Sequence, residues 1–340
     1  MNVSTKNNII FSFPGNKRII VGVILVAIAV IIPFFTSEYI QTLIQKGLLW
    51  IPSVYGVYFL YSLLHQVHFA QSIFIGLGGY LTAFLAGKYF FTNELLILLP
   101  IGLLIGGVVS ALLGIIIMKR TGFYFAVMGI AITMVFWSIV YKARDLTGGS
   151  DGIPGIRNPS IFTIQLSNQG LYYVSLILSI SMILLMLRIL KSPFSLQLRA
   201  IGGDLDKSES IGIPVKKMQR VAFIIAGVFA SMTGIMLAFM YNYVSPETFS
   251  WDYGSIFVQA AILGGTVYLE SPILGVFCFI ILEFLVSTWF PFLWEIIIGL
   301  GIVIIIITLG EEGFTGLARK LFSRIMFKRN LLERTYKNGK

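Results

Sequence analysis

The sequence predicts an all-α polytopic membrane protein with about ten transmembrane helices. Its 340 residues are 57% hydrophobic and only 12% charged, and the mean hydropathy is +0.89. Apolar runs of membrane-spanning length also follow one another along most of the chain. A chain of this composition is solvated mainly by lipid, so a soluble globular core is excluded. We expect one transmembrane domain over residues 19–310.

Hydropathy divides this domain into separate spans, each near the length that crosses a hydrocarbon core. The predicted spans are residues 19–35, 47–64, 70–90, 95–118, 122–141, 171–190, 218–240, 253–269, 272–290 and 293–310. Residues 1–18 before them are polar and basic, and no small-residue cleavage site follows the first apolar run. We therefore expect a cytoplasmic N-terminal segment and a retained first helix instead of a cleaved signal peptide.

The spans at 47–64 and 70–90 are the weakest, because polar residues separate them and glycines follow at close spacing. The residues concerned are His65, Gln66, His68, Gln71, Gly76, Gly78 and Gly79. Irregular backbone at membrane depth is tolerated where it lines a cavity, which makes Gly78 and Gly79 candidates for a translocation pathway. The alternative is a cytoplasmic turn followed by glycines that allow tight helix contact. The same packing role is expected of Gly102 and Gly106, which form a GxxxG pattern.

The distribution of charge predicts the orientation of the chain. Counted over the predicted loops, 20 of the 25 Lys and Arg residues fall on the side that holds both termini. The other side keeps only Lys46, Lys88, Lys142, Arg144 and Arg157. Cytoplasmic loops carry the excess of Lys and Arg, so both termini and the 191–217 loop should be cytoplasmic, in the cell membrane. Short basic patches between apolar spans are typical of membrane orientation, and no nucleic-acid partner is expected.

The 191–217 loop is long and charged in a chain that otherwise has few charges. Ser192 and Pro193 end the preceding helix and are expected to start the next, since serine can cap a helix and proline is tolerated in its first turn. Phe194, Leu198 and Ile201 then fall on one helical face, which suits a groove on a partner protein. Residues 204–209 form a charged connector, and Gly212 turns the chain back toward the bilayer.

Motifs for catalysis and nucleotide binding are missing from the sequence. There is no GxxxxGK[ST], HExxH, CxxC or GxSxG pattern, so we expect no catalytic residue, no cofactor and no metal site. If solute moves uphill with ATP, another polypeptide must hydrolyse it. Cys278 is the only cysteine, which excludes a disulfide within the chain. Glu283 is the one charge well inside a span, and it either faces the pathway or a partner subunit or snorkels to the interface.

Two predicted external segments are distinctive. TGGSDGIPGI (147–156) has four glycines and a proline, which favour tight turns with positive φ. It either caps the mouth of a pathway, meets a partner protein, or is a solvated loop, and Arg144 and Asp151 are its polar residues of interest. YVSPETFSW (243–251) should begin a short helix after Ser245, with aromatic anchors at the membrane interface. The predicted anchors are Tyr243, Phe249 and Trp251.

Residues 311–340 form a basic cytoplasmic tail. Its apolar residues, Phe314, Leu317, Leu321 and Ile325, fall on one helical face among Lys and Arg. This pattern favours an amphipathic helix lying on anionic lipid, with contact to a partner protein as the alternative.

Several segments together carry a family resemblance. They are KRTGFYFAVMGIA (119–131), TGGSDGIPGI (147–156), SPFSLQLRAI (192–201) with SIGI (210–213), and YVSPETFSW (243–251) with LGG (263–265). In this order and spacing, residues 47–317 resemble the LivM-type permease subunit of ABC importers for branched-chain amino acids.

The resemblance implies an ABC importer permease bundle. Its implied partners are a second related permease subunit, two cytoplasmic ABC ATPase subunits, an extracytoplasmic substrate-binding protein and the lipid bilayer. It also makes the 191–217 loop the expected ATPase-coupling loop. The residues implied there are Ser192, Pro193, Phe194, Leu198, Arg199, Ile201 and Gly212.

The chain departs from the family pattern at HQVHFAQ (65–71), TVYLESP (266–272) and EEGFTGL (311–317), where glycines or a proline are replaced. These changes leave the substrate open between branched-chain amino acids and urea or short amides. A different class, an ion-coupled secondary transporter, should show an inverted repeat and paired intramembrane charges. The sequence shows no convincing repeat, and Glu283 has no second charge of this kind in the spans.

Overall fold

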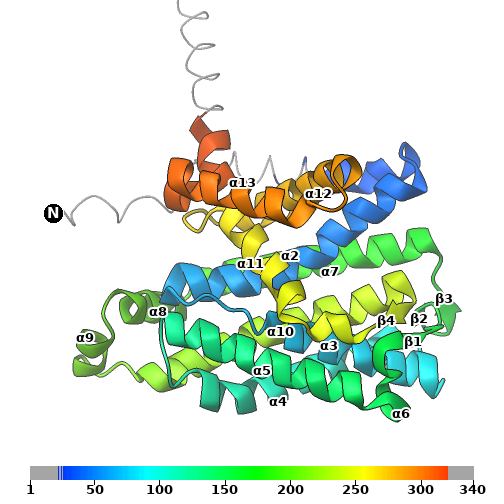
Figure 1. The fold of residues 1–340 in the computed structure, drawn as a ribbon, viewed down its shortest axis with the longest axis horizontal. Coiled ribbons are helices and arrows are strands. Elements are labelled where there is room, and N and C mark those ends of the chain that lie inside the picture. Colours follow the sequence, from blue (N-terminus) through cyan, green and yellow to red (C-terminus); the bar gives the residue numbers. More distant parts are fainter. Residues whose placement is uncertain (1–21, 23, 25, 321–340) are drawn as a thin grey trace, which may run out of the picture. The chain divides into compact units, whose positions relative to one another are not determined.

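The computed structural model describes residues 22, 24 and 26–320 and is almost entirely helical over them (Figure 1). The α-helices are α2 Glu38–Leu64, α3 Gln71–Thr82, α4 Leu95–Ile117, α5 Phe123–Lys142, α6 Arg144–Thr147, α7 Asn168–Leu190, α8 Pro193–Gly203, α9 Leu205–Ser210, α10 Val215–Tyr241, α11 Trp251–Gly264, α12 Ser271–Trp289 and α13 Trp294–Leu309. The predicted N-terminal segment, 1–18, lies outside the described residues.

Short elements connect these helices. A π-helical turn, η3 Ala83–Lys88, continues α3, and four 3₁₀ turns are η2 Ile32–Phe34, η4 Gly149–Asp151, η5 Pro246–Phe249 and η6 Gly310–Glu312. Four two-residue strands are β1 Ile153–Pro154, β2 Ser160–Ile161, β3 Ile164–Gln165 and β4 Tyr243–Val244. β1 pairs with β4 and β2 pairs with β3, both antiparallel.

The polytopic helical fold predicted from the sequence is confirmed. Within the described residues, seven segments are helical, long and apolar enough to cross a membrane, and each overlaps a predicted span. They are Glu38–Leu64, Leu95–Ile117, Phe123–Lys142, Asn168–Leu190, Val215–Tyr241, Ser271–Trp289 and Trp294–Lys320.

The other three predicted spans differ from these seven. In the span predicted at 19–35, residues 22, 24 and 26–31 are helical and end in η2, while residues 19–21, 23 and 25 lie outside the described residues. The span predicted at 70–90 is divided between α3 and the π-helical η3. The one predicted at 253–269 is the shorter α11, which ends at Gly264.

The described residues divide into two compact units, with the boundary between Val258 and Gln259. In the unit that ends at Val258, α10 is the central helix, and it packs against α2, α3 and α4. Small residues make this possible. A side chain on Gly78 would overlap the Ser231 carbonyl, and one on Gly234 would overlap the Ile75 carbonyl, so the α3 and α10 backbones lie in direct contact.

Hydrogen bonds between helices reinforce this packing. Ser231 Oγ donates to the Gly102 carbonyl at 2.8 Å, Thr233 Oγ1 donates to the Leu49 carbonyl at 2.9 Å, and Ser179 Oγ donates to the Leu48 carbonyl at 2.6 Å. Bonds of this kind contribute about 0.6 kcal/mol each on average inside a membrane protein. They fix which face of each helix is turned inward.

The unit that begins at Gln259 is held by close backbone contacts around Gly264. Thr315 Oγ1 donates to the Gly264 carbonyl at 2.7 Å, and Thr266 N donates to the Glu311 carbonyl at 2.9 Å. Arg319 forms an ion pair with Glu270. The segment after α11 is thereby tied to the segment after α13.

Candidate functional site

The glycine-rich segment after α5 forms the tight turns that its sequence predicts. Gly148, Gly149, Gly152 and Gly155 all have φ between 59° and 80°. A side chain on Gly148 would overlap the Gly152 carbonyl, so this position requires glycine for space as well as for conformation.

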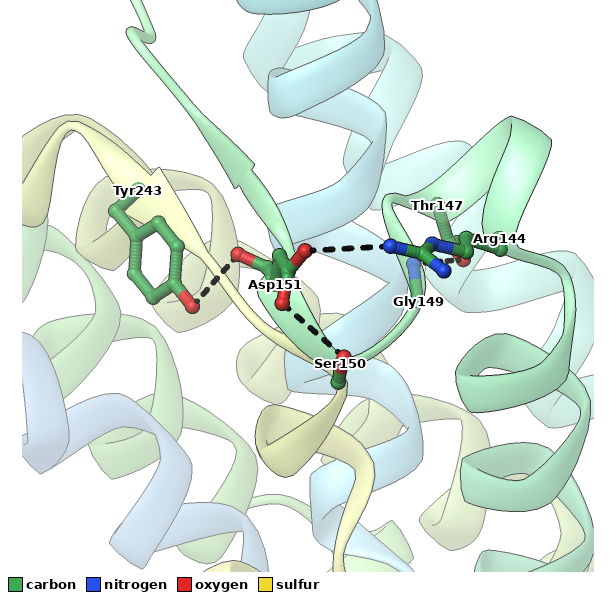
Figure 2. A network of polar contacts seen from close by, with 6 residues as sticks. All are labelled: Arg144, Thr147, Gly149, Ser150, Asp151 and Tyr243. Atoms are coloured by element: carbon green, nitrogen blue, oxygen red, sulfur yellow. Dashed lines mark hydrogen bonds and ion pairs between the residues drawn. The ribbon is translucent and has the colours of Figure 1, made fainter.

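Asp151 is the centre of a polar network in this segment (Figure 2). Ser150 Oγ donates to Asp151 Oδ1 at 3.1 Å, and Arg144 Nη2 lies 3.8 Å from Asp151 Oδ2. Tyr243 Oη donates to the Asp151 backbone carbonyl at 3.1 Å. Both charged side chains are about three-quarters exposed, so this ion pair orients the loop more than it stabilises the fold.

The two segments that the sequence predicts to be external are joined in the structure. Ile153 pairs with Val244 in the β1–β4 ladder, and Ile156 N donates to the Asn242 carbonyl at 3.2 Å. Asn242 follows α10 with φ 51°, a left-handed conformation that asparagine tolerates well. Segments about ninety positions apart therefore form one platform beside the ends of α5 and α10.

The segment after β4 agrees with its prediction in part. The predicted short helix after Ser245 is present as η5, and Thr248 N donates to the Ser245 carbonyl. Phe249, however, is not an interfacial anchor, since only 1% of it is exposed and its ring stacks on Phe136. Trp251 remains partly exposed, at 41%.

The predicted coupling loop contains α8 and α9. Pro193 occupies the first turn of α8, as expected. Ser192 stands at the N-cap, but its hydroxyl donates backward to the Ile189 carbonyl at 2.6 Å, so the predicted side-chain cap does not form. Gly212 has φ 85° in the turn that leads into α10.

The apolar stripe of α8 faces the chain's own α2 and not outward. Leu198 is fully buried and Ile201 is 4% exposed, while the Phe194 ring lies 6.3 Å from that of Phe59. A side chain on Gly202 would overlap the Leu63 carbonyl. The stripe that was expected to fit a groove on a partner therefore packs on α2 in the structure.

A different face of the loop is left open. Leu196 is 71% exposed on α8, and Ile211 is 75% exposed just beyond α9. Pro193 and Ala200 are also exposed, whereas Arg199 is half-buried. Leu196 and Ile211 are therefore the large aliphatic side chains of this loop that are most accessible to a partner.

Asp204 has a role that the sequence prediction missed. It was interpreted only as part of a charged connector, yet its carboxylate caps α9 by accepting from Lys207 N at 3.0 Å. The Lys207 ammonium lies 2.9 Å from the same carboxylate. The backbone hydrogen bond from Lys207, followed by its side chain, lowers the pKa of Asp204. An aspartate directly before a short helical segment is an N-cap signal, and this pattern could have predicted the cap.

The glycine candidates for a pathway lie in a helix contact. Gly78 touches the α10 backbone, and a side chain on Gly79 would approach Val244 Cγ2 at 3.0 Å. This arrangement corresponds to the packing alternative raised for this region. Glu283, the other candidate, is half-buried in α12.

The polar residues between α2 and α3, 65–71, also have a structural role. Gln71 Nε2 donates to the Ser53 carbonyl at 3.0 Å and to Ser53 Oγ at 3.1 Å, which ties α3 to α2. His68 is fully buried, and its ring lies 4.8 Å from that of Phe223. Among the described residues, no group of three or more His, Cys, Asp or Glu side chains is placed to hold a metal ion.

Comparison with known proteins gives a family match over most of the chain. Residues 39–307 match the family described as branched-chain amino acid transport system / permease component. The match runs from the first turn of α2 to the last turn of α13.

Three curated relatives have names of the same kind. The high-affinity branched-chain amino acid transport system permease protein LivM of Escherichia coli is 23% identical over 72% of this chain and 62% of its own length. LivM of Salmonella typhimurium is 23% identical over 71% and 62%. The probable branched-chain amino acid transport permease protein LivH of Methanocaldococcus jannaschii is 27% identical over 46% and 52%.

The matched region thus spans about three-fifths of the length of the two LivM relatives. No solved structure matches the chain.

Proposed function

Because the chain belongs to the family of permease components of branched-chain amino acid transport systems, we propose that it is the membrane-spanning permease subunit of an ATP-driven importer of branched-chain amino acids. The continuous family match over residues 39–307 carries this proposal. In this function the chain is a transport subunit and not an enzyme, and separate subunits hydrolyse ATP.

The partners follow from this function. We propose that a second related permease completes the pathway, that two cytoplasmic ABC ATPase subunits drive it, and that an extracytoplasmic binding protein delivers the solute. Both termini and the 191–217 loop then lie in the cytoplasm, as the excess of Lys and Arg on that side indicates.

We propose that the ATPase binds the open face of the coupling loop, through Leu196 on α8 and Ile211 beyond α9. These side chains are 71% and 75% exposed, whereas Leu198 and Ile201 are buried. Because α8 is fastened to the end of α2 through Phe194 and Gly202, a movement imposed on α8 is passed directly to a central membrane helix.

The test is uptake of labelled leucine by cells with and without this chain. We expect uptake to require both the chain and an ATPase partner with an intact nucleotide-binding lysine. Inhibition of uptake by excess valine or isoleucine supports the proposed substrate class. Inhibition by urea or acetamide and not by valine would reassign the substrate to that class.

The same uptake assay distinguishes an ATP-driven importer from an ion-coupled secondary transporter. Uptake that continues when the ATPase lysine is replaced, but stops when an ionophore collapses the ion gradient, would contradict an ATP-driven importer. In that case the family membership would stand, but the proposed source of energy would not.

A further inference from the structure

Three consecutive aromatic residues are exposed in the short connection between η3 and α4. Tyr89 is 61% exposed, Phe90 is 53% exposed and Phe91 is 81% exposed. The connection is only six residues long, from 89 to 94, and α4 after it is a membrane-spanning helix. These rings must therefore lie close to the level at which the chain leaves and re-enters the bilayer.

The β2–β3 hairpin is fastened to this connection. Ser160 N donates to the Asn93 carbonyl at 2.9 Å, and Asn93 Nδ2 donates to the Asn158 carbonyl at 2.7 Å. At the tip, Thr163 N donates to Glu94 Oε1. The hairpin is thus held at the same level as the N-terminus of α4, at the end of the unit where Figure 1 shows all four strands.

The hairpin tip also presents apolar side chains outward. Phe162 is 77% exposed and Ile164 is 70% exposed. Phe162 has φ 50° and Thr163 has φ 69°, so both tip residues are in the left-handed region. Glycine or asparagine fits that conformation far better than phenylalanine does. Phe90, in the connection, has the same strained conformation, with φ 50°.

Two exposed phenylalanines thus occupy positions that the local backbone disfavours. An exposed ring that the backbone does not favour and that fills no core points to a contact outside the chain. The neighbouring charge fits the membrane surface, because the Arg157 guanidinium lies 4.2 Å over the Phe90 ring and can reach lipid phosphate.

We propose that Phe90, Phe91, Phe162 and Ile164 form an aromatic anchor that inserts the β2–β3 hairpin into the headgroup and upper acyl region of the bilayer. The occupant of this surface is lipid. Its position is continuous with the lipid-facing side of α4, where Leu96 and Ile97 are 52% and 47% exposed directly after the connection. Apolar side chains at this depth bury their area while the flanking backbone stays hydrated.

The anchor has a mechanical consequence. β2 and β3 precede α7, and α7 packs against α2, the helix to which α8 is fastened. Holding the hairpin in the interface keeps the connection between α5 and α7 from moving freely in water. The proposal rests only on the membrane fold, so it stands or falls separately from the transported substrate.

The experiment is a depth measurement by spin labelling in lipid nanodiscs. In a Cys278→Ala background, a nitroxide is attached at Thr163→Cys, and its collision rates with oxygen and with a water-soluble nickel chelate are compared. Leu104→Cys on α4, 67% exposed, is the lipid reference, and Ser150→Cys, in the exposed loop of Figure 2, is the water reference. We expect the label at 163 to be shielded from nickel at least threefold relative to the label at 150.

Phe162→Asn is the decisive variant, because asparagine suits the left-handed backbone and keeps the hairpin turn while removing the ring. We expect it to bring the label at 163 to the accessibility of the label at 150, whereas Phe162→Tyr should leave the label shielded. Full nickel accessibility at 163 with Phe162 present would overturn the proposal. So would shielding that arises only when an extracytoplasmic binding protein is added, since that result would make the surface a protein contact.

Discussion

Leu196 and Leu198 stand two positions apart in α8, yet 71% of one and none of the other is exposed. Truncating Leu198 leaves a cavity against α2, which should cost about 2–5 kcal/mol and lower the Tm of the purified subunit. Truncating Leu196 should change stability by less than about 0.5 kcal/mol. We expect Leu196→Ala instead to reduce the amount of ATPase that co-purifies with the subunit.

Comparing Leu196→Ala with Leu198→Ala tests which face of α8 contacts the ATPase, and also whether the coupling loop is needed for that contact. The chemical change is the same at both positions, so a difference between the variants reports the direction that each side chain faces. Normal ATPase co-purification and normal uptake with Leu196→Ala and Ile211→Ala combined would contradict docking on this face.

Gly78 provides a second test at the level of one residue. Its added methyl group would overlap the Ser231 carbonyl of α10, and backbone cannot move aside as a flexible side chain can. Gly78→Ala should therefore separate α3 from α10 and lower the Tm by several degrees. Gly107→Ala on α4 is the matched control, because the methyl group would find only Val228 Cγ2, at 3.4 Å.

Alanine favours a helix by about 1 kcal/mol over glycine at either position, so the control should be neutral or slightly stabilising. Equal Tm values for Gly78→Ala and the unaltered chain would show that α3 and α10 can separate at no cost. The packing role assigned to Gly78 would then be wrong, and its candidacy for the pathway would return.

Among the elements, α9 is a short helix that depends on its cap. Asp204 is charged when it accepts from Lys207 N, and this hydrogen bond, with the Lys207 ammonium, lowers the pKa of the carboxyl. A lowered folded-state pKa means that the stabilisation is present above the ordinary carboxyl pKa and is lost as the pH falls through the folded value. We expect amide protection in residues 205–210 to fall in this acid range.

Asp204→Asn should retain the cap at neutral pH and remove the acid dependence, since asparagine also caps helices but does not titrate. Asp204→Ala should lower protection at every pH. Hydrogen exchange read by mass spectrometry on the peptide that covers α9 measures both. An unchanged acid dependence in Asp204→Asn would assign the effect to another group.

The extent of most helices was predictable from the sequence, but which element packs against each helix face was not. The period of Phe194, Leu198 and Ile201 correctly gave a short amphipathic α8. A periodic apolar stripe predicts only that one face of the helix is buried. Packing against α2 and packing against another protein would both bury it. That α2 is the neighbour of this stripe depends on the close approach of Gly202 to Leu63, which brings together parts of the chain about 140 positions apart.

The same limit explains the misplaced aromatic anchor Phe249. Phe249 was predicted at the interface because it follows a predicted membrane helix, yet it fills space left by Gly76, where a side chain would overlap its ring. The residue that determines the burial of Phe249 is thus a glycine far from it in the sequence. Glycine-rich turns such as 147–156 were predicted well, because a positive φ is a local requirement of the residue itself.

At the scale of the molecule, contacts between loops show which loops share a side of the membrane. The Leu63 carbonyl meets Gly202, residues 93–94 bond to 158–163, β1 pairs with β4, and the Glu311 carbonyl accepts from Thr266 N. Each of these pairs joins loops or span ends that the predicted alternation of ten spans puts on one side. These contacts therefore agree with the alternation, while the cytoplasmic assignment remains a prediction from charge.

The orientation can be tested with two single cysteines in a Cys278→Ala background. Ser150 lies in the Figure 2 network and Ser210 at the end of α9, and both are exposed. The excess of Lys and Arg predicts that Ser210→Cys faces the cytoplasm and Ser150→Cys the outside. A membrane-impermeant maleimide should label position 150 in intact cells and position 210 only in inverted vesicles. Labelling of position 210 in intact cells would remove the coupling loop from the ATPase side, and the proposed drive through α8 would fail with it.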